Sequence, residues 1–274
     1  MKELRLILGD QLNINHSWYQ KVDPDVAYLM MEVKSETHRS PQHAQKVLGT
    51  FAAMRAFSAS LSSLGHHVHY LSIGAPDNQQ SFSGNASYFC EKFAVSSFSW
   101  QQPDSWYVDE ELKEFFNASS LEGGEVSTEH FFEPRDGLAT FMQNRSTWKM
   151  ENWYRHLRVK HDVLIEDGKP TGGNWNFDKE NRKAWRGEPS PDSASGPTYD
   201  HSALWDEITQ AKVTTFGNPS AAAFQWPSNR EESLEMLKRF CNGNLKFFGD
   251  YQDAMSEKSQ TLFHSLLSFS LNLK

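Results

Sequence analysis

The sequence is poor in cysteine, and it lacks both a long apolar run and an excess of positive charge. Its only cysteines, Cys90 and Cys241, have no zinc-type spacing, so we expect buried free thiols rather than a disulfide, a zinc site or a cysteine-ligated iron-sulfur cluster. No apolar run reaches the roughly 18 residues of a membrane span, and the start of the chain lacks a signal peptide's apolar stretch. We therefore expect a cytoplasmic protein that does not bind membranes.

The charge balance and two missing motifs narrow the function classes further. With 35 acidic and 27 basic residues the formal net charge is -8, so no general positive field attracts DNA, and any DNA contact must use a local patch. No Gly-x-Gly-x-x-Gly follows the first apolar run and no Walker A motif occurs, which argues against the nucleotide sites built on them. The 274 residues suffice for one or two globular domains.

Short apolar runs alternate with helical patterns over residues 1–132. Strands are expected at 4–8, 26–31, 67–73, 95–100 and 125–128, and helices at 41–64, 77–93 and 105–116. Gly65 follows the longest helix at the position where glycine commonly ends one. This order predicts an α/β domain with a Rossmann-like, five-stranded parallel sheet flanked by helices.

The pattern changes after residue 132. Residues 133–228 read as an interdomain linker with a helix at 147–161, a strand and turn at 163–170, and a loop rich in Gly, Pro and Ser at 187–202. Residues 229–274 are helical in pattern, and an apolar helical run at 262–271 precedes the last residues. We expect these residues to begin a helical domain of a longer parent protein.

Polar side chains follow the first two predicted strands. Gly9, Asp10 and Gln11 come directly after the first strand, where open α/β sheets bind ligands, so Asp10 and Gln11 are placed to hydrogen-bond a small molecule. An Asx turn is the alternative. After the second strand, donors and acceptors that could complete the site are Glu32, Glu36, Arg39, His43 and Lys46. Each alone could be a solvated charge at a helix start, and the spacing does not suit a metal.

Two segments beyond the α/β region leave alternatives open. Residues 148–158 interleave aromatic and cationic side chains, which suits either a buried helix face or a surface that stacks bases and neutralises phosphates. Residues 172–182 combine a glycine hinge with many hydrogen-bonding groups, and composition does not decide between a structural clasp and a contact loop.

Several motifs, in one order, resemble a known family. They are Leu6-Ile7-Leu8-Gly9-Asp10-Gln11-Leu12, Met31-Glu32-Val33 with Glu36, His43 and Gln45-Lys46, Ala53-Met54-Arg55, Met150-Glu151 with Tyr154-Arg155, Gly172-Gly173 before Trp175-Asn176-Phe177-Asp178, Gln252-Asp253-Ala254-Met255 and His264-Ser265-Leu266-Leu267-Ser268. The chain resembles the iron-sulfur bacterial cryptochromes and photolyases, the prokaryotic (6-4) photolyase type. The resemblance covers essentially the whole chain but only about the first half of the family's length.

The resemblance implies two cofactors for this part of the chain. Residues 1–132 are similar to an antenna domain that holds 6,7-dimethyl-8-ribityllumazine, and the matching positions are Gly9, Asp10, Gln11, Glu32 and Glu36. Arg39-Ser40 stands where the family commonly has Tyr-Val. Ser265 and Ser268 match a stretch that contacts FAD phosphates, and hydroxyls three residues apart on a helix share one face.

The resemblance also implies an activity for the parent protein. The family's FAD-binding helical domain would begin within 229–274, and its 4Fe-4S cluster would lie beyond Lys274. The parent is expected to be a monomeric light-dependent DNA photolyase that repairs (6-4) lesions in damaged DNA by electron transfer from reduced FAD, and the fragment alone is expected to be inactive. The alternatives are a stand-alone module that binds a ribityl chromophore or nucleotide, and a blue-light photoreceptor without repair activity.

Overall fold

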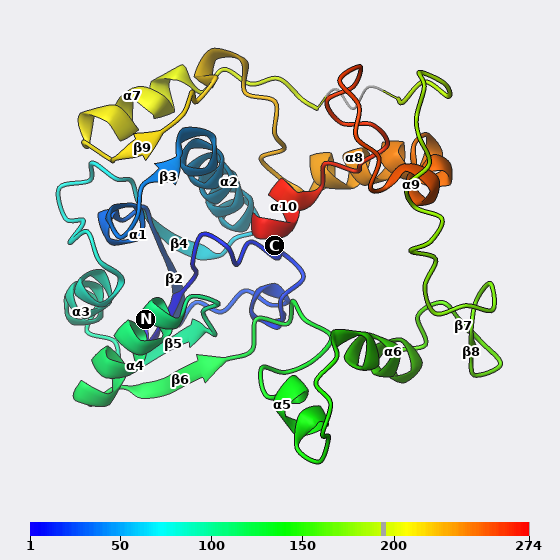
Figure 1. Cartoon of the computed structure of the whole chain (residues 1–274). Helices are drawn as coiled ribbons and strands as arrows, with labels where there is room; N and C mark the ends of the chain where they lie inside the picture. Colours follow the sequence, from blue (N-terminus) through cyan, green and yellow to red (C-terminus); the bar gives the residue numbers. More distant parts are fainter. Residues whose placement is uncertain (193–195, 274) are drawn as a thin grey trace. The chain divides into compact units, whose positions relative to one another are not determined.

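The computed structural model describes residues 1–192 and 196–273, and its main sheet is the one that the sequence predicts (Figure 1). Five parallel strands lie in the order β4-β2-β1-β5-β6. Their bounds are β1 Glu3–Leu6, β2 Val26–Met31, β4 His67–Leu71, β5 Ser97–Gln101 and β6 Glu122–Val126. The predicted α/β class with a five-stranded parallel sheet is therefore confirmed.

Alternating side chains give the sheet two buried faces. In β2, Ala27, Leu29 and Met31 point into one apolar cluster, whereas Tyr28 and Met30 point into the other. This alternation follows from the two-residue period of a strand, and burial on both faces explains why β2 is a continuous apolar run.

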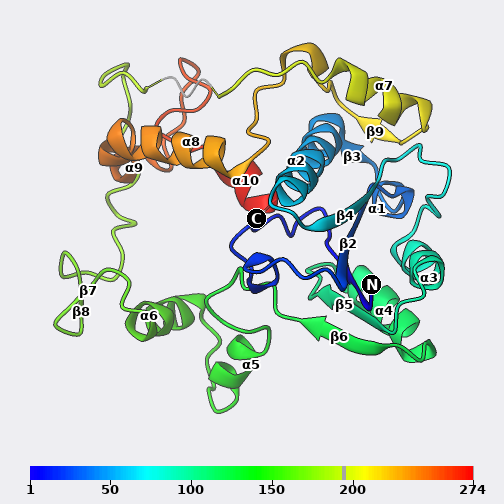
Figure 2. The same cartoon turned by 180° about the vertical axis from the view of Figure 1, so that it is seen from behind.

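Helices cover both faces of the sheet. The helices α3 (Phe82–Lys92) and α4 (Trp106–Ala118) pack on one face, and α2 (Ala44–Ser63) packs on the other (Figures 1 and 2). The predicted inner face of α2 is buried through Val47, Phe51, Met54, Ser58 and Leu61. Gly65 follows the helix with φ +93°, as its position suggests.

The strand order creates a switch point beside β1. The chain adds β2 and then β4 on one side of β1, and it adds β5 and then β6 on the other. Connections from the carboxyl ends of β1 and β5 therefore leave in opposite directions, and ligands of open α/β sheets bind in the crevice that this divergence leaves.

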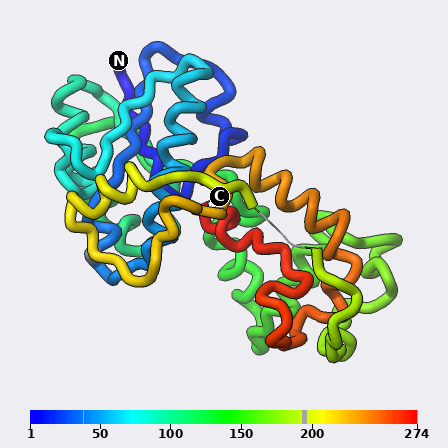
Figure 3. Tube along the Cα trace, turned by 90° about the horizontal axis from the view of Figure 1, so that it is seen from above, coloured from blue at the N-terminus to red at the C-terminus, as the bar shows by residue number. Residues whose placement is uncertain are grey.

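Several short elements escape the sequence prediction. They include α1 (Lys34–His38), the parallel pair β3 (Gln42–His43) and β9 (Thr215–Phe216), α7 (Ser202–Gln210), and the 3-10 helices η1 (Ser17–Tyr19) and η2 (Ala221–Ala223). Leu204 and Ile208 of α7 belong to the apolar cluster of α2, and Figure 3 shows the yellow segment that contains α7 beside the α/β region. Part of the predicted loop at 187–202, residues 193–195, lies outside the described residues.

The described chain forms two compact units that are not continuous in sequence. The first comprises residues 1–128, 196–238 and 266–273, and the second comprises residues 129–192 and 239–265. The first unit also contains the short helix α10 (Ser268–Leu273). The helix predicted over 262–271 is wrong in its first half, because Leu262 and Leu266 have positive φ angles of 45° and 57°.

The second unit holds short helices and one hairpin. Its elements are α5 (Gly137–Met142), α6 (Met150–Lys160), β7 (Ile165–Glu166), β8 (Lys169–Pro170) and α9 (Leu245–Tyr251), while α8 (Arg230–Asn242) contributes residues to both units. The antiparallel pair β7–β8 agrees only in part with the predicted strand at 163–165 and turn at 167–170. The first strand begins at Ile165, after a left-handed Leu164, and Lys169–Pro170 form a strand rather than the end of the turn.

The glycine-hinged segment folds back onto α6. The Asn176 amide donates to the Glu151 carboxylate at 3.1 Å, and the Arg155 and Arg158 guanidinium groups lie 5.4 and 5.3 Å from the Trp175 ring centre. These contacts join the segment to α6, and its role as a structural clasp stays a prediction. On α6 itself Trp153 is buried and Tyr154 is exposed, so its aromatic stripe is only partly core.

The two cysteines differ in environment. Cys90, in α3, is buried as predicted. Cys241, near the end of α8, is exposed, so the expectation of a buried thiol is wrong for Cys241. Cys241 lies in the last turn of α8, between Phe240 and Asn242, and its side chain faces solvent.

The left-handed conformation of Gly65 yields a stability prediction. Gly65→Ala should destabilise the protein by about 1 kcal/mol, because an L side chain is unfavourable at this backbone conformation although no atom would clash with it severely. Gly74→Ala is the control, since an added Cβ there meets nothing within 4 Å. Urea unfolding of the two variants checks this, and equal midpoints would contradict it.

Candidate functional site

A cavity of about 290 Å³ lies at the carboxyl ends of β1, β2 and β5. One part of its lining is apolar and consists of Leu8, Met31, Val33, Phe51, Met54 and Phe82. Polar groups line the rest, chiefly Asp10, Glu36, Thr37, Lys46, Asp104 and Ser105. An apolar cavity with a few convergent polar groups suits a small ligand that has an aromatic ring and a polar edge.

Gly9 lets the turn after β1 approach α2. A Cβ at this position would lie 2.9 Å from the Met54 sulfur and 3.1 Å from a methyl carbon of Thr50. Because Met54 and Thr50 also line the cavity, a larger residue would push the turn away from the helix that forms the opposite wall. Gly9 therefore fixes the distance between two walls of the cavity.

Glu36 is a cavity residue whose acidity is shifted by its surroundings. Its side chain is 42% exposed, yet partial desolvation raises the pKa of its carboxyl, while Arg39 opposes the shift and Asp10 adds to it. On the same side, the Lys46 ammonium donates to the Gln42 side-chain oxygen at 3.1 Å. The lining of the cavity thus includes three carboxyl residues, Asp10, Glu36 and Asp104, and one ammonium, that of Lys46.

Arg39 connects two segments that carry lining residues. Its guanidinium lies 4.1 Å from the Tyr107 ring centre and 4.0 Å from the Glu36 carboxylate. Arg39 lies two residues after Thr37, which lines the cavity. Tyr107 lies in the first turn of α4, two residues after Ser105, which also lines it. This cation–π contact therefore holds the α1 segment to the start of α4.

Gln11 does not line the cavity. Its buried side chain accepts a hydrogen bond from the Leu8 amide at 3.0 Å and donates to the carbonyls of Gln101 and Gln102 at 3.1 and 3.3 Å. These bonds tie the end of β1 to the end of β5 at the switch point. Gln11 builds the site's frame, and its predicted ligand contact stays a prediction.

Glu32 is also outside the lining and is fully buried. Arg55 donates to its two carboxylate oxygens at 2.7 and 3.1 Å, and the Ile73 amide donates at 2.8 Å. The Tyr70 hydroxyl donates at 2.7 Å, and burial, followed by the Glu32 charge, raises the pKa of Tyr70 so that the hydroxyl remains a donor. Four donated bonds occupy this carboxylate within the protein.

Of the five predicted chromophore positions, the structure brings three to the cavity. These three are Gly9, Asp10 and Glu36. Lys46, one of the donors predicted to complete the site, also lines the cavity. His43 is elsewhere: its ring accepts a hydrogen bond from the Gln45 amide at 3.2 Å as the cap of α2 and packs edge-on to Phe216. Of the donors and acceptors predicted after the second strand, only Glu36 and Lys46 therefore line the cavity.

The two predicted FAD contacts lie in different structural contexts. Ser268 is the first residue of α10, whereas Ser265 precedes the helix and belongs to the second compact unit. The shared helical face expected for them is wrong, because the helix begins too late to include Ser265. Two hydroxyls are few for so large a cofactor, and FAD contact at these residues stays a prediction.

The lining residues that sequence reasoning missed include Asp104, Ser105, Asn272 and Leu273. Asp104 and Ser105 follow β5 and precede α4, so the rule that selected Asp10 could have found them too. Asn272 and Leu273 of α10 reach the cavity from far along the chain, and no local pattern in the sequence indicates this.

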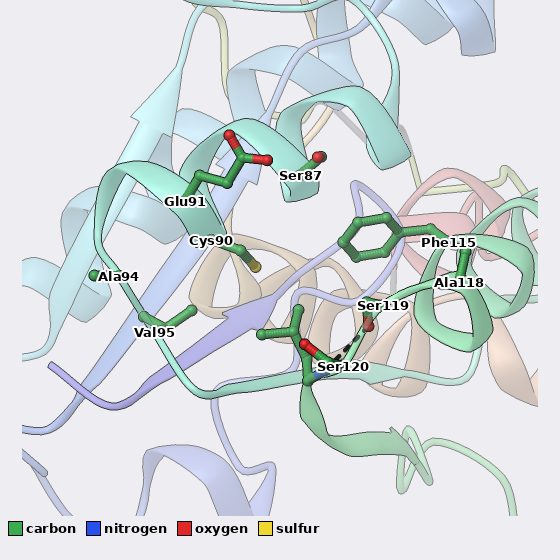
Figure 4. A pocket seen from close by; sticks show the side chains of 10 residues that line it. Ser87, Cys90, Glu91, Ala94, Val95, Phe115, Ala118, Ser119 and Ser120 are labelled. Atoms are coloured by element: carbon green, nitrogen blue, oxygen red, sulfur yellow. Dashed lines mark hydrogen bonds between the residues drawn. The ribbon is translucent and has the colours of Figure 1, made fainter.

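A second cavity, of about 660 Å³, lies between α3 and α4 near the amino ends of β5 and β6 (Figure 4). Cys90 lines it, and burial raises the pKa of this thiol to about 12, which keeps it protonated and a poor nucleophile or metal ligand. Glu91 is the only ionisable carboxylate among its lining residues. This cavity lacks the convergent polar groups of the one beside β1.

The structure also bears on metals and membranes. Among the residues that it describes, no three His, Cys, Asp or Glu side chains converge so that they could hold a metal ion. Within the same residues, no helix combines the length and the apolar composition needed to cross a lipid bilayer.

Comparison with known proteins identifies the family. A family model described as deoxyribodipyrimidine photo-lyase-related protein matches residues 5–226. The chain belongs to this family. It is also 30% identical over 275 residues to a (6-4) photolyase of Agrobacterium fabrum (strain C58 / ATCC 33970), an alignment that covers 99% of this chain and 54% of that protein. The chain thus spans about half the length of this photolyase, and the family resemblance seen in the sequence motifs is confirmed.

The buried Glu32–Arg55 pair yields a prediction. Arg55→Met should lower the free energy of unfolding by about 3 kcal/mol, because it leaves a fully buried carboxylate without its cation. Adding Glu32→Gln should restore part of the loss. The control is Lys92→Met, which breaks the exposed pair with Asp77 and should cost less than about 1 kcal/mol. Urea titrations that show equal losses for Arg55→Met and Lys92→Met would refute the assignment.

Proposed function

We propose that the α/β unit seats an antenna chromophore, 6,7-dimethyl-8-ribityllumazine, for a light-dependent DNA photolyase of the (6-4) type. The observation that carries the proposal is the cavity at the carboxyl ends of β1, β2 and β5, with Asp10, Glu36 and Lys46 facing an apolar wall. Membership of the photolyase-related family supports the same assignment.

The size of the cavity favours a compact ligand. Its volume of about 290 Å³ is at the lower end of the range that small-molecule sites span, which begins near 300 Å³. A fused ring with a short polyol chain suits this volume better than a dinucleotide such as FAD. The apolar wall offers Met31, Phe51 and Phe82 to the ring faces.

The polar lining suits the ligand's heteroatoms. The Asp10 and Glu36 carboxyls can accept hydrogen bonds from ribityl hydroxyls, and the Lys46 ammonium can donate to a ring carbonyl oxygen. When bound, the chromophore would supply absorption of light, and the residues around it would bind it, orient it and exclude water. Held by several walls of a packed domain, the ring would keep one orientation, as energy transfer requires.

The remaining assignments concern the parent protein. We propose 1–132 as the antenna domain, 133–228 as the interdomain linker and 229–274 as the beginning of an FAD-binding helical domain, with Ser265 and Ser268 near the FAD phosphates. Electron transfer to damaged DNA, FAD and the 4Fe-4S cluster would then depend on sequence beyond this part, as the greater length of the Agrobacterium relative suggests.

Chromophore uptake tests the proposal. Asp10→Asn and Glu36→Gln should each weaken the binding of 6,7-dimethyl-8-ribityllumazine by about tenfold, because each removes a charged hydrogen-bond acceptor of the cavity. Fluorescence titration of the purified chain measures this. Glu114→Gln, an exposed carboxylate on α4 that does not line the cavity, is the matched control. Unchanged affinity in both cavity variants would remove the assignment.

The contact between Arg39 and Tyr107 should slow the release of the chromophore. Arg39→Ala should raise the dissociation rate by about threefold, the effect of losing an exposed cation–π contact that joins two rim segments. Stopped-flow fluorescence measures this rate. Arg145→Ala removes a similar stack on Phe141 in the other compact unit and should leave the rate unchanged. Equal rates in the two variants would contradict a role at the rim.

A further inference from the structure

One wall of the cavity comes from outside the α/β layer. Asn272 and Leu273 of α10 line it, together with residues that follow β1, β2 and β5. The Leu12 amide donates to the Leu273 carbonyl at 3.4 Å, which joins the end of α10 to the loop that carries Asp10. A six-residue helix far along the chain thus completes a site that is otherwise built within the first 105 residues.

A notch in α2 holds this helix. Gly49 lies on the buried face of α2, and a Cβ at this position would come within 2.4 Å of the tip of the Phe269 ring and 2.8 Å of the tip of Phe224. The Phe269 ring also stacks on Trp226 at 5.4 Å between centroids and 24° between planes. The Phe269 ring can therefore pack against α2 only because Gly49 has no side chain.

The other side of α10 borders another cavity, distinct from the two described above. A cavity of about 590 Å³ lies between α2 and α8 and is lined from α10 by Ser270 and Leu271, with Leu273 lining both cavities. Leu271 is 70% exposed. A short helix bordered by two cavities is held by few contacts. For α10 they include the Phe269 notch, the Leu273 hydrogen bond, and a hydrogen bond from the Ser233 hydroxyl to the Ser270 hydroxyl at 2.9 Å.

We propose that Phe269, seated at Gly49, is a positioning residue for the ligand cavity: it holds α10 as a wall that can detach, and ligand affinity is linked to the seating of this helix. This inference rests on the proposed function for the identity of the ligand. Because linkage is reciprocal, a ligand that contacts Asn272 and Leu273 stabilises the seated helix to the same degree that the seated helix strengthens binding.

Gly49→Ala tests the proposal without changing a residue that lines the cavity. In the 274-residue chain it should weaken the binding of 6,7-dimethyl-8-ribityllumazine by about tenfold, because one wall of the site is displaced. Hydrogen exchange of residues 267–273 should become faster in the variant, and the lumazine should slow it in the unaltered chain. Gly74→Ala, where an added methyl meets nothing within 4 Å, should change neither readout.

A second variant guards against misfolding. Phe269→Ala removes the ring instead of filling the notch. It adds no atom to α2, it removes the contacts of the Phe269 ring with Gly49 and Phe224, and it should act in the same direction. If either folded variant exchanges faster at 267–273 yet binds the lumazine as the unaltered chain does, the inference is wrong and the proposed function stands. If the unaltered chain binds no lumazine, the proposed function fails and the inference fails with it.

Discussion

The buried ion pair of Glu32 and Arg55 is the interaction on which the architecture around the cavity depends. It fixes the residue that follows β2 to α2, and through Tyr70 and the Ile73 amide it also fixes the end of β4. Arg55 further donates to Glu207 at 3.0 and 2.7 Å, which attaches α7 to the same point. A charge buried this deeply is tolerated only where every partner is in place, so the pair specifies one arrangement of these elements.

Much of the fold could be predicted from local patterns. The continuous apolar run of β2 and the apolar face of α2 are strong local signals, and the predicted bounds of both elements agree with the structure to within a few residues. The pair β3–β9 could not be predicted, because two-residue strands from positions 42–43 and 215–216 have no period of their own. Likewise α10 starts at Ser268 rather than earlier, since Leu262 and Leu266 adopt left-handed conformations that side-chain polarity does not reveal.

The candidate site was only partly predictable for a related reason. Asp10, Gln11, Glu32 and Glu36 all follow strand ends, and sequence position cannot separate those that face a cavity from those that hold the frame. Three-dimensional partners separate them: Gln11 joins two strand ends and Glu32 meets four donors, whereas Asp10 and Glu36 line the cavity. The frame residues are needed for the site as much as the lining residues, because they fix where its walls stand.

The wall formed by α10 connects this cavity to the segment that the family resemblance associates with FAD. The helix begins at Ser268 and ends with Asn272 and Leu273 at the cavity, so at 1.5 Å per residue its two ends are only about 8 Å apart. A ligand that orders the cavity end of so short a helix also orders the backbone at Ser268. Helix formation is cooperative, and a helix of about one and a half turns is too short for one end to unfold while the other stays formed. A ligand bound as proposed would therefore couple binding at one end of α10 to order at the other.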